Sequence, residues 1–254
     1  MKTTASTTYV AVNGSYQSYT INVGNADVEV YIPDDNLRSV LESALGKNAD
    51  EAITEVELAR LTEIEYVGKG PEELQITDLT GLEHCTSLTL LHLNNNQISD
   101  ISALKELTNL NTLYLSGNQI TDISALKDAK KLWSLYLGGN PLEDLTVLNG
   151  LPWLSTLELK GCSIKEISAI SDPTELKYLF LQGNKIRDLQ PLLDMVEKDA
   201  AGEKRFAPYL HLYVADNPLR GKARGKQIRR MKKLGVRVNN AKKKKKKKKK
   251  SLRK

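Results

Sequence analysis

A leucine pattern that recurs every 22 residues constrains this chain more than any other feature. Five segments match L-x-x-L-x-L-x-x-N, with cysteine in place of asparagine in the fourth. Their first leucines are Leu88, Leu110, Leu132, Leu154 and Leu176. A sixth copy begins at Tyr209, 33 residues after the fifth, and a degenerate copy before the first keeps only Ile76, Leu79 and Leu82. A unit of this size cannot bury its apolar side alone, so the copies must stack on one another.

The spacing inside each copy predicts the fold class. The L-x-L segment indicates a short strand with its leucines facing the core. The second half, represented by Ile98, Ile101 and Leu104, advances in steps of three, which favours a 3₁₀ or extended segment. We therefore expect an α/β chain folded as a right-handed solenoid, with a parallel β-sheet on the concave side and a 3₁₀ or extended convex side. The extra residues before the sixth copy, in DMVEKDAAGEKRFAP, predict a longer helix or an excursion.

Both ends of such a solenoid must be closed by polar caps. PDDNLRSVLESALGK predicts a helix with Asp34 or Asp35 as N-cap and Gly46 as its stop, and TEVELARL follows with a capping box formed by Thr54 and Glu57. At the other end, KQIRRMKKLGVRV predicts a helix followed by a short strand. The expected segments are an N-terminal arm, β-rich or flexible (1–31), a helical N-terminal cap (32–65), the repeats (66–219), a helix–strand C-terminal cap (220–240) and a disordered lysine tail (241–254).

Two polar columns are explained by stacking. The asparagines that end the motif can bridge the backbones of neighbouring turns. Cys162 occupies the same column and is expected to be buried and inert, roughly 15 Å from Cys85 and thus too far away for a disulfide. A second column contains Asp78, Asp100, Asp122, Asp144, Glu166 and Asp188. These carboxylates are expected to cap the return segments, and a calcium ladder is the alternative.

The repeated motif is the leucine-rich-repeat signature. Together with the cap PDDNLRSVLESALGK…ITEVELARLT and the first copies ITDLTGLEHCTSLTLLHLNNNQISDISALKELTNL, it resembles the internalin-like bacterial leucine-rich-repeat proteins over about residues 32–240. The resemblance implies secretion or surface display and protein binding through the concave face. No signal peptide, sorting motif or membrane span is evident in the chain, so a cytoplasmic location also stays open. A second resemblance, to 22-residue-repeat phosphatase-regulatory subunits, implies an intracellular regulator.

The outward face of the predicted sheet carries the candidate binding residues. The residue between the two leucines of each strand points away from the core. Across the copies this column contains His92, Tyr114, Tyr136, Glu158, Phe180 and Tyr213, and Tyr178 lies in the column two residues earlier. An aromatic ridge of this kind supplies interface hot spots at low entropic cost. Alternatively, the rings stabilise the sheet by stacking along it. We expect a protein or peptide partner on this face and a monomeric protein.

The remaining sequence offers little for catalysis. The three histidines have no metal-ligand spacing, and no nucleophile motif is present, so we expect a non-enzymatic protein without cofactor or metal. Twenty of the 37 Lys and Arg lie in the last 36 residues, which contain no acid, and this leaves residues 1–218 with a charge of −14. The lysine run at 242–250 therefore predicts weak non-specific contact with a polyanion (nucleic acid, anionic lipid or wall polymer) as an alternative function.

Overall fold

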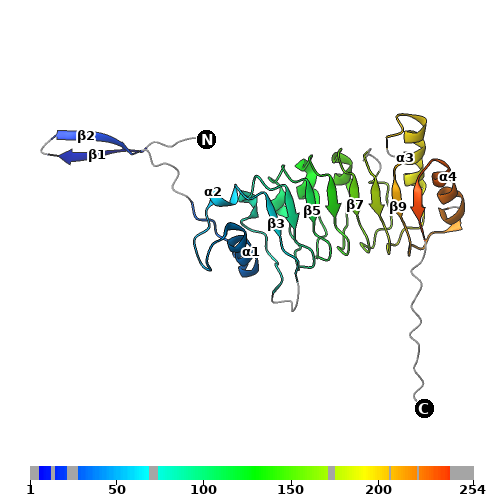
Figure 1. Ribbon diagram of the computed structural model, residues 1–254, viewed down its shortest axis with the longest axis horizontal. Helices are drawn as coiled ribbons and strands as arrows, with labels where there is room; N and C mark the ends of the chain where they lie inside the picture. The colour runs from blue at the N-terminus through cyan, green and yellow to red at the C-terminus, as the bar shows by residue number, and fades with distance from the viewer. Residues whose placement is uncertain are drawn as a thin grey trace, which may run out of the picture.

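A sheet of parallel strands, arranged in chain order, runs along the molecule. The computed structural model describes residues 6–12, 15–21, 28–68, 74–170, 175–205, 207–221 and 223–240. Within them, one open sheet runs from edge strand β3 to edge strand β10 (Figure 1). Its strands are β3 (Glu63–Glu65), β4 (Leu90–His92), β5 (Thr112–Tyr114), β6 (Ser134–Tyr136), β7 (Thr156–Glu158), β8 (Tyr178–Phe180), β9 (His211–Tyr213) and β10 (Arg237–Asn239). The predicted parallel solenoid is confirmed.

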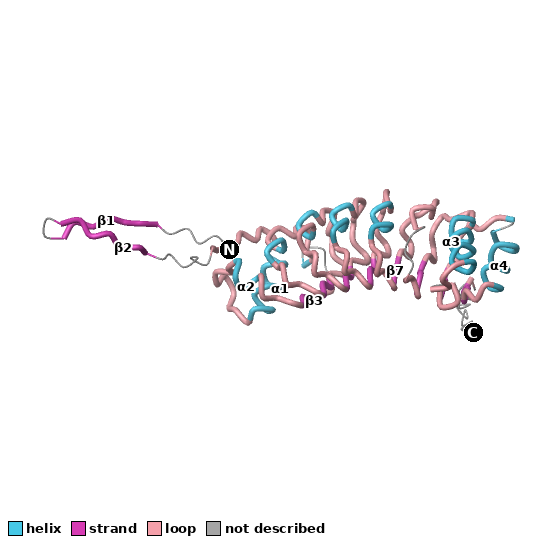
Figure 2. The backbone as a smooth tube through the Cα atoms, turned by 90° about the horizontal axis from the view of Figure 1, so that it is seen from above, coloured by secondary structure: helices cyan, strands magenta, loops and turns pink. Residues whose placement is uncertain are grey.

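The return segments lie on the side of the solenoid opposite the strands (Figure 2). Four of them contain 3₁₀ turns, at Leu82–His84, Ser102–Leu104, Ser124–Asp128 and Thr146–Gly150. The inserted residues before the sixth copy form the predicted longer helix, α3 (Gln190–Ala201), which begins with proline in its first turn. The three-residue spacing of the apolar positions therefore predicted the 3₁₀ turns of these four return segments correctly.

The core is a column of aliphatic side chains that runs the length of the solenoid. Equivalent leucines lie side by side in adjacent strands, for example Leu91, Leu113 and Leu135, and each of them is fully buried. Burying a leucine contributes roughly 1.5–3 kcal/mol, so each added repeat stabilises its neighbours through shared apolar surface. The strands have the register that the leucine spacing predicts.

A ladder of asparagines ties consecutive turns together. The Asn118 Oδ1 accepts a hydrogen bond from the Ile98 N–H at 3.1 Å, and its Nδ2 donates to the carbonyls of Leu93 and Leu115 at 3.0 and 2.9 Å. The equivalent side-chain amides join neighbouring repeats in the same way; they belong to Asn96, Asn140, Asn184 and Asn217. These bonds satisfy backbone groups that stacking removes from water. The predicted bridging role is confirmed.

Cys162 interrupts this ladder. Its thiol lies 3.3 Å from the Leu137 carbonyl, but it offers no amide oxygen to the preceding turn, where the Leu142 N–H bonds to the Asn140 carbonyl instead. Burial raises the pKa of the Cys162 thiol to about 11 and that of Cys85 to about 12. Both cysteines are free, as predicted, and both are buried, which the sequence predicted for Cys162.

The aspartates of the carboxylate column cap the return segments, whereas Glu166 makes no such bond with the described residues. The two Asp100 carboxylate oxygens accept hydrogen bonds from the Ser102 N–H and hydroxyl at 2.8 and 3.0 Å. Equivalent bonds are made by Asp78, Asp122 and Asp144, and Asp188 accepts from the Gln190 N–H. Among the described residues, no group of three or more potential ligands is placed to hold a metal ion, and no helix is long and apolar enough to cross a membrane.

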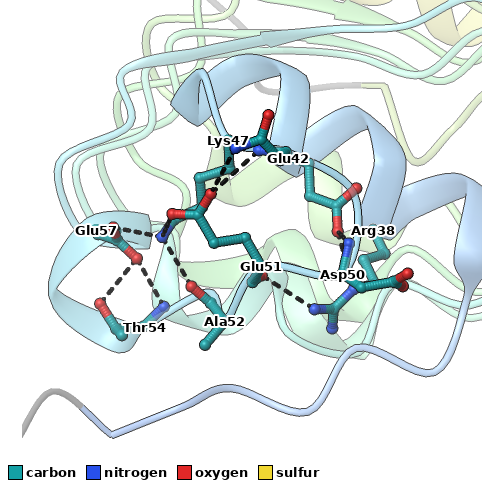
Figure 3. A network of polar contacts seen from close by, with 9 residues as sticks. Arg38, Glu42, Lys47, Asp50, Glu51, Ala52, Thr54 and Glu57 are labelled. Atoms are coloured by element: carbon teal, nitrogen blue, oxygen red, sulfur yellow. Dashed lines mark hydrogen bonds and ion pairs between the residues drawn. The ribbon is translucent and has the colours of Figure 1, made fainter.

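The N-terminal cap begins as predicted. Helix α1 (Asp35–Leu45) has Asp34 as its N-cap and ends at Gly46, which adopts a left-handed conformation with φ 69°. Helix α2 (Glu55–Leu58) has the predicted capping box of Thr54 and Glu57. Figure 3 shows how polar contacts connect the two helices: the Lys47 ammonium lies 2.8 Å from the Glu57 carboxylate and 3.4 Å from that of Glu51.

Two features near the N-terminus add to the sequence-based description. Strand β3 lies in the segment assigned to the helical cap and extends the sheet by one strand. Its Ile64 is buried beside Leu91. In the N-terminal arm, β1 (Ser6–Val12) and β2 (Ser15–Ile21) pair antiparallel. Residues 13–14 between them and the lysine tail at 241–254 lie outside the described residues.

The C-terminal cap has the predicted helix and strand. Helix α4 (Ile228–Lys233) follows a π-type turn at Ala223–Gln227 and buries Ile228 and Met231. Strand β10 then pairs with β9 and completes the sheet.

Asp34 should control the stability of the N-terminal cap at low pH. It is nearly buried, which raises its pKa, but hydrogen bonds from the Thr77, Leu37 and Asp78 N–H groups and the Thr77 hydroxyl outweigh that effect and lower the pKa from its ordinary value. The charged carboxylate therefore stabilises the fold above about pH 4, and this contribution is lost as the pH falls through the depressed pKa.

We expect Asp34→Ala to lower the free energy of unfolding by about 2–4 kcal/mol at pH 7, because four hydrogen bonds to one carboxylate are lost. Urea unfolding between pH 3 and 7 measures this, with Asp35→Ala, an exposed neighbour, as the control. The difference between wild type and Asp34→Ala should shrink at low pH. A constant difference would contradict the assignment.

Cys162→Asn should strengthen the asparagine ladder. The new amide can accept from the Leu142 N–H as Asn140 accepts from the Ile120 N–H at 3.0 Å. We expect a gain of about 0.5–1.5 kcal/mol in the free energy of unfolding, and a loss of similar size for the converse variant Asn140→Cys. Thermal and urea unfolding test both, and a destabilised Cys162→Asn would show that the site cannot hold an amide.

Candidate functional site

The candidate site is the outward surface of the sheet, here called the strand face. It consists of the first and third residues of the strands, because the central residue of each is turned toward the core. The structure places all seven sequence-predicted residues on it: His92, Tyr114, Tyr136, Glu158, Tyr178, Phe180 and Tyr213. They project from β4 to β9 and form a row across the sheet.

The N-terminal part of this row is a stack of three rings. The rings of Tyr114 and Tyr136 are nearly parallel, with centroids 4.4 Å apart and an interplanar angle of 13°. His92 continues the stack at 4.7 Å from Tyr114 with a tilt of 39°. Pairs of this kind contribute about 0.5–1.5 kcal/mol beyond their buried area. These rings therefore stabilise the sheet and at the same time form a preorganised surface.

A second group of rings lies toward the C-terminus. The Phe180 and Tyr213 rings stack with centroids 4.6 Å apart, and Tyr178 lies 5.0 Å from His211. His211 is in the outward column of Tyr178 but was not among the predicted site residues. Tyr178 is the most open of the predicted aromatic side chains, with 41% of its surface exposed.

Glu158 separates the two ring groups. It lies on β7 between Tyr136 and Phe180, and its carboxylate leans back over β6. There the Oε2 accepts hydrogen bonds from the Gly138 N–H at 2.8 Å and from the Ser116 hydroxyl at 3.1 Å. A Cβ at position 138 would collide with this carboxylate, so glycine makes room for it.

The surroundings of Tyr136 raise the pKa of its phenol. Burial raises the pKa of its phenol, and the neighbouring Tyr114 and the Glu158 carboxylate raise it further. The phenol therefore stays neutral and able to donate a hydrogen bond throughout the physiological pH range.

The two ends of the strand face carry opposite charge. Glu63 and Glu65 are exposed on β3, and Arg237 is exposed on β10. The Arg237 Nη1 lies 2.7 Å from the His211 Nε2, and a guanidinium can only donate in such a contact. Next to them is an open hollow of about 750 Å³, which Tyr213 and Lys232 also line. The sequence predicted the edge strand β10, but not the edge strand β3, which lacks the complete motif.

Exposed tryptophans flank the ring groups. Trp133 and Trp153 are 42% and 57% exposed, and the Lys177 ammonium lies 5.4 Å from the centroid of the Trp133 ring. Two buried polar atoms near the strand face, the His92 Nε2 and the Gln182 Oε1, have no hydrogen-bond partner among the described residues.

Comparisons with known proteins agree with the repeat fold. The family model described as leucine-rich repeats (two copies) matches residues 86–128 and 108–150. An internalin from Listeria monocytogenes, internalin F, is similar in structure with a TM-score of 0.69 and 26% sequence identity, over 85% of this chain and 66% of the internalin. Internalin C2 of the same organism has a TM-score of 0.59 and 24% identity, over 82% of this chain and 94% of its own.

The functional domain of internalin J, also from Listeria monocytogenes and described as including a cysteine ladder, has a TM-score of 0.55 and 25% identity over 77% of this chain and 39% of its own. No curated protein sequence matches the chain.

Gly138 and Glu158 should be energetically coupled. Gly138→Ala forces the Glu158 carboxylate out of its place and should lower the free energy of unfolding by about 1–2 kcal/mol. In a Glu158→Ala background the same change should be neutral or slightly stabilising, since the collision is absent and alanine restricts the unfolded chain. A double-mutant cycle by urea unfolding measures the coupling. Equal costs in both backgrounds would contradict it.

Proposed function

Because the chain is an internalin-like leucine-rich-repeat protein, we propose that it is a non-catalytic interaction module that binds a protein or peptide through the strand face. The supporting observation is the pair of preformed ring groups on an open sheet surface. Their side chains are half-buried by mutual stacking, so they lose little conformational entropy when a partner covers the remaining edges.

The polar surroundings of the rings suit a partner interface. Thr112, Ser134 and Thr156 lie beside the ring row and can donate or accept hydrogen bonds at its rim. A central aromatic patch with a polar border is the usual anatomy of a protein-binding surface. The proposal includes that the protein binds its partner as a monomer.

Polyanion binding through the basic C-terminus is the competing proposal. The described part of that region favours it modestly: α4 exposes Arg229, Lys232 and Lys233. Arg230 is already paired with Glu197 at 2.7 Å. Intracellular regulation of a phosphatase is a third proposal and rests on sequence resemblance alone.

The quadruple variant Tyr114→Ala, Tyr136→Ala, Phe180→Ala and Tyr213→Ala should lose partner binding. Because the probe must not presuppose the partner, we would select a random-peptide display library on the immobilised wild type and measure the affinity of enriched peptides for each variant. A loss of at least about 100-fold is expected, since each aromatic hot spot contributes about 2 kcal/mol or more. Tyr31→Ala, which removes a 79% exposed tyrosine just before the N-terminal cap, should bind like the wild type.

Far-ultraviolet circular dichroism must show that the quadruple variant is folded, although loss of two stacked pairs should lower its melting temperature by several degrees. Peptides that bind the folded quadruple variant as tightly as the wild type would overturn the proposal. Binding that weakens steeply with salt and vanishes on deletion of residues 241–254 would favour the polyanion alternative.

A further inference from the structure

The row of rings on the strand face is interrupted at one position. Stacked contacts join Tyr114 to Tyr136 and Phe180 to Tyr213, but no ring lies between Tyr136 and Phe180, where β7 carries Glu158. The Glu158 side chain does not fill this position between the rings, because its carboxylate is directed over Gly138 toward Ser116. The space above β7 is therefore flanked by two aromatic faces and bordered by a carboxylate.

The dimensions of the interruption match one planar group. Tyr136 and Phe180 project from β6 and β8, two strand spacings or roughly 9.5 Å apart. The rings within each stack are 4.4 and 4.6 Å apart, so a flat group midway between Tyr136 and Phe180 would continue the row at nearly the same spacing. An additional saturated side chain would not reproduce this stacking.

The charge at the interruption requires a cation. The half-buried Glu158 carboxylate makes no ion pair of 4 Å or less with any Lys, Arg or His of the described residues. Its hydrogen bonds with the described residues engage the Oε2, which leaves the Oε1 as an acceptor. The neighbouring Lys177 is directed to the Trp133 ring instead. A partly desolvated carboxylate without a cation is unfavourable until a partner supplies one.

We propose that the interruption at Glu158 is a binding site for a guanidinium group, namely an arginine side chain that a protein or peptide partner inserts between Tyr136 and Phe180. This inference rests on the proposed binding role of the strand face and identifies the partner's central residue by its chemistry. A guanidinium is planar, stacks on aromatic faces and donates to carboxylates. A lysine ammonium supplies the charge without the plane, and a phenyl ring supplies the plane without the charge.

The test uses the peptide acetyl-Gly-Arg-Gly-amide and the full chain. The chain contains two phenylalanines, so selective ring labelling gives a resolvable NMR signal for Phe180, assigned by comparison with Phe180→Leu. We expect saturable shifts of the Phe180 signal with the arginine peptide. The matched peptide with citrulline, which is flat but neutral, should bind at least about tenfold more weakly, and the lysine peptide several-fold more weakly.

Glu158→Gln is the decisive variant, because its amide oxygen can still accept from the Gly138 N–H while the charge is removed. It should weaken the arginine peptide at least about tenfold and leave the citrulline peptide unchanged. The control Glu143→Gln removes one negative charge from the return side of the preceding repeat and should bind like the wild type. Absence of saturable binding, equal affinity for the arginine and citrulline peptides, or an unaffected Glu158→Gln would each overturn the arginine site.

The two proposals fail in different ways. Display-selected peptides that depend on the four aromatic residues but lack arginine, and bind Glu158→Gln normally, would sustain the strand face and overturn the arginine site. Selected peptides that contain arginine and lose binding to Glu158→Gln support both.

Discussion

Hydrogen bonding between successive turns through the asparagine ladder is the constraint on which the rest of the structure depends. Stacked leucines supply most of the apolar burial, but they would leave backbone groups without partners at every turn. The Asn118 amide satisfies groups of two repeats at once, and its equivalents do the same along the solenoid. Because each amide fits only when the neighbouring repeat is in register, this ladder fixes the alignment of the strands.

Registered strands create the candidate site as a consequence. Equivalent outward positions in adjacent parallel strands are separated by one strand spacing, about 4.8 Å, which is close to the distance at which aromatic rings stack. The ring-centroid separations of 4.4 and 4.6 Å on the strand face reflect this coincidence. The core beneath the sheet thus holds the row of rings in place, so binding of a partner loses little conformational entropy of these side chains.

Departures from the repeat are of two kinds, and only their surroundings distinguish them. Cys162 replaces an asparagine in the buried ladder, where the loss is confined to one bond of the Leu142 backbone. Glu158 replaces a ring on the open face, where its carboxylate leans over Gly138 at the edge of the gap between the two ring groups and has no ionic partner among the described residues. The first departure concerns stability, whereas the second places a distinct chemistry in the middle of the proposed interface.

The sequence by itself determined the repeat register, the buried leucines, the asparagine and aspartate columns and the bounds of α1, because each depends on a period or on neighbours within four residues. It also placed Tyr114, Tyr136, Phe180 and Tyr213 in one row. Only the tertiary structure showed strand β3, where Ile64 alone represents the motif, and the lean of Glu158 onto Gly138 and Ser116. Those features depend on contacts between residues 20 or more positions apart, which no local pattern specifies.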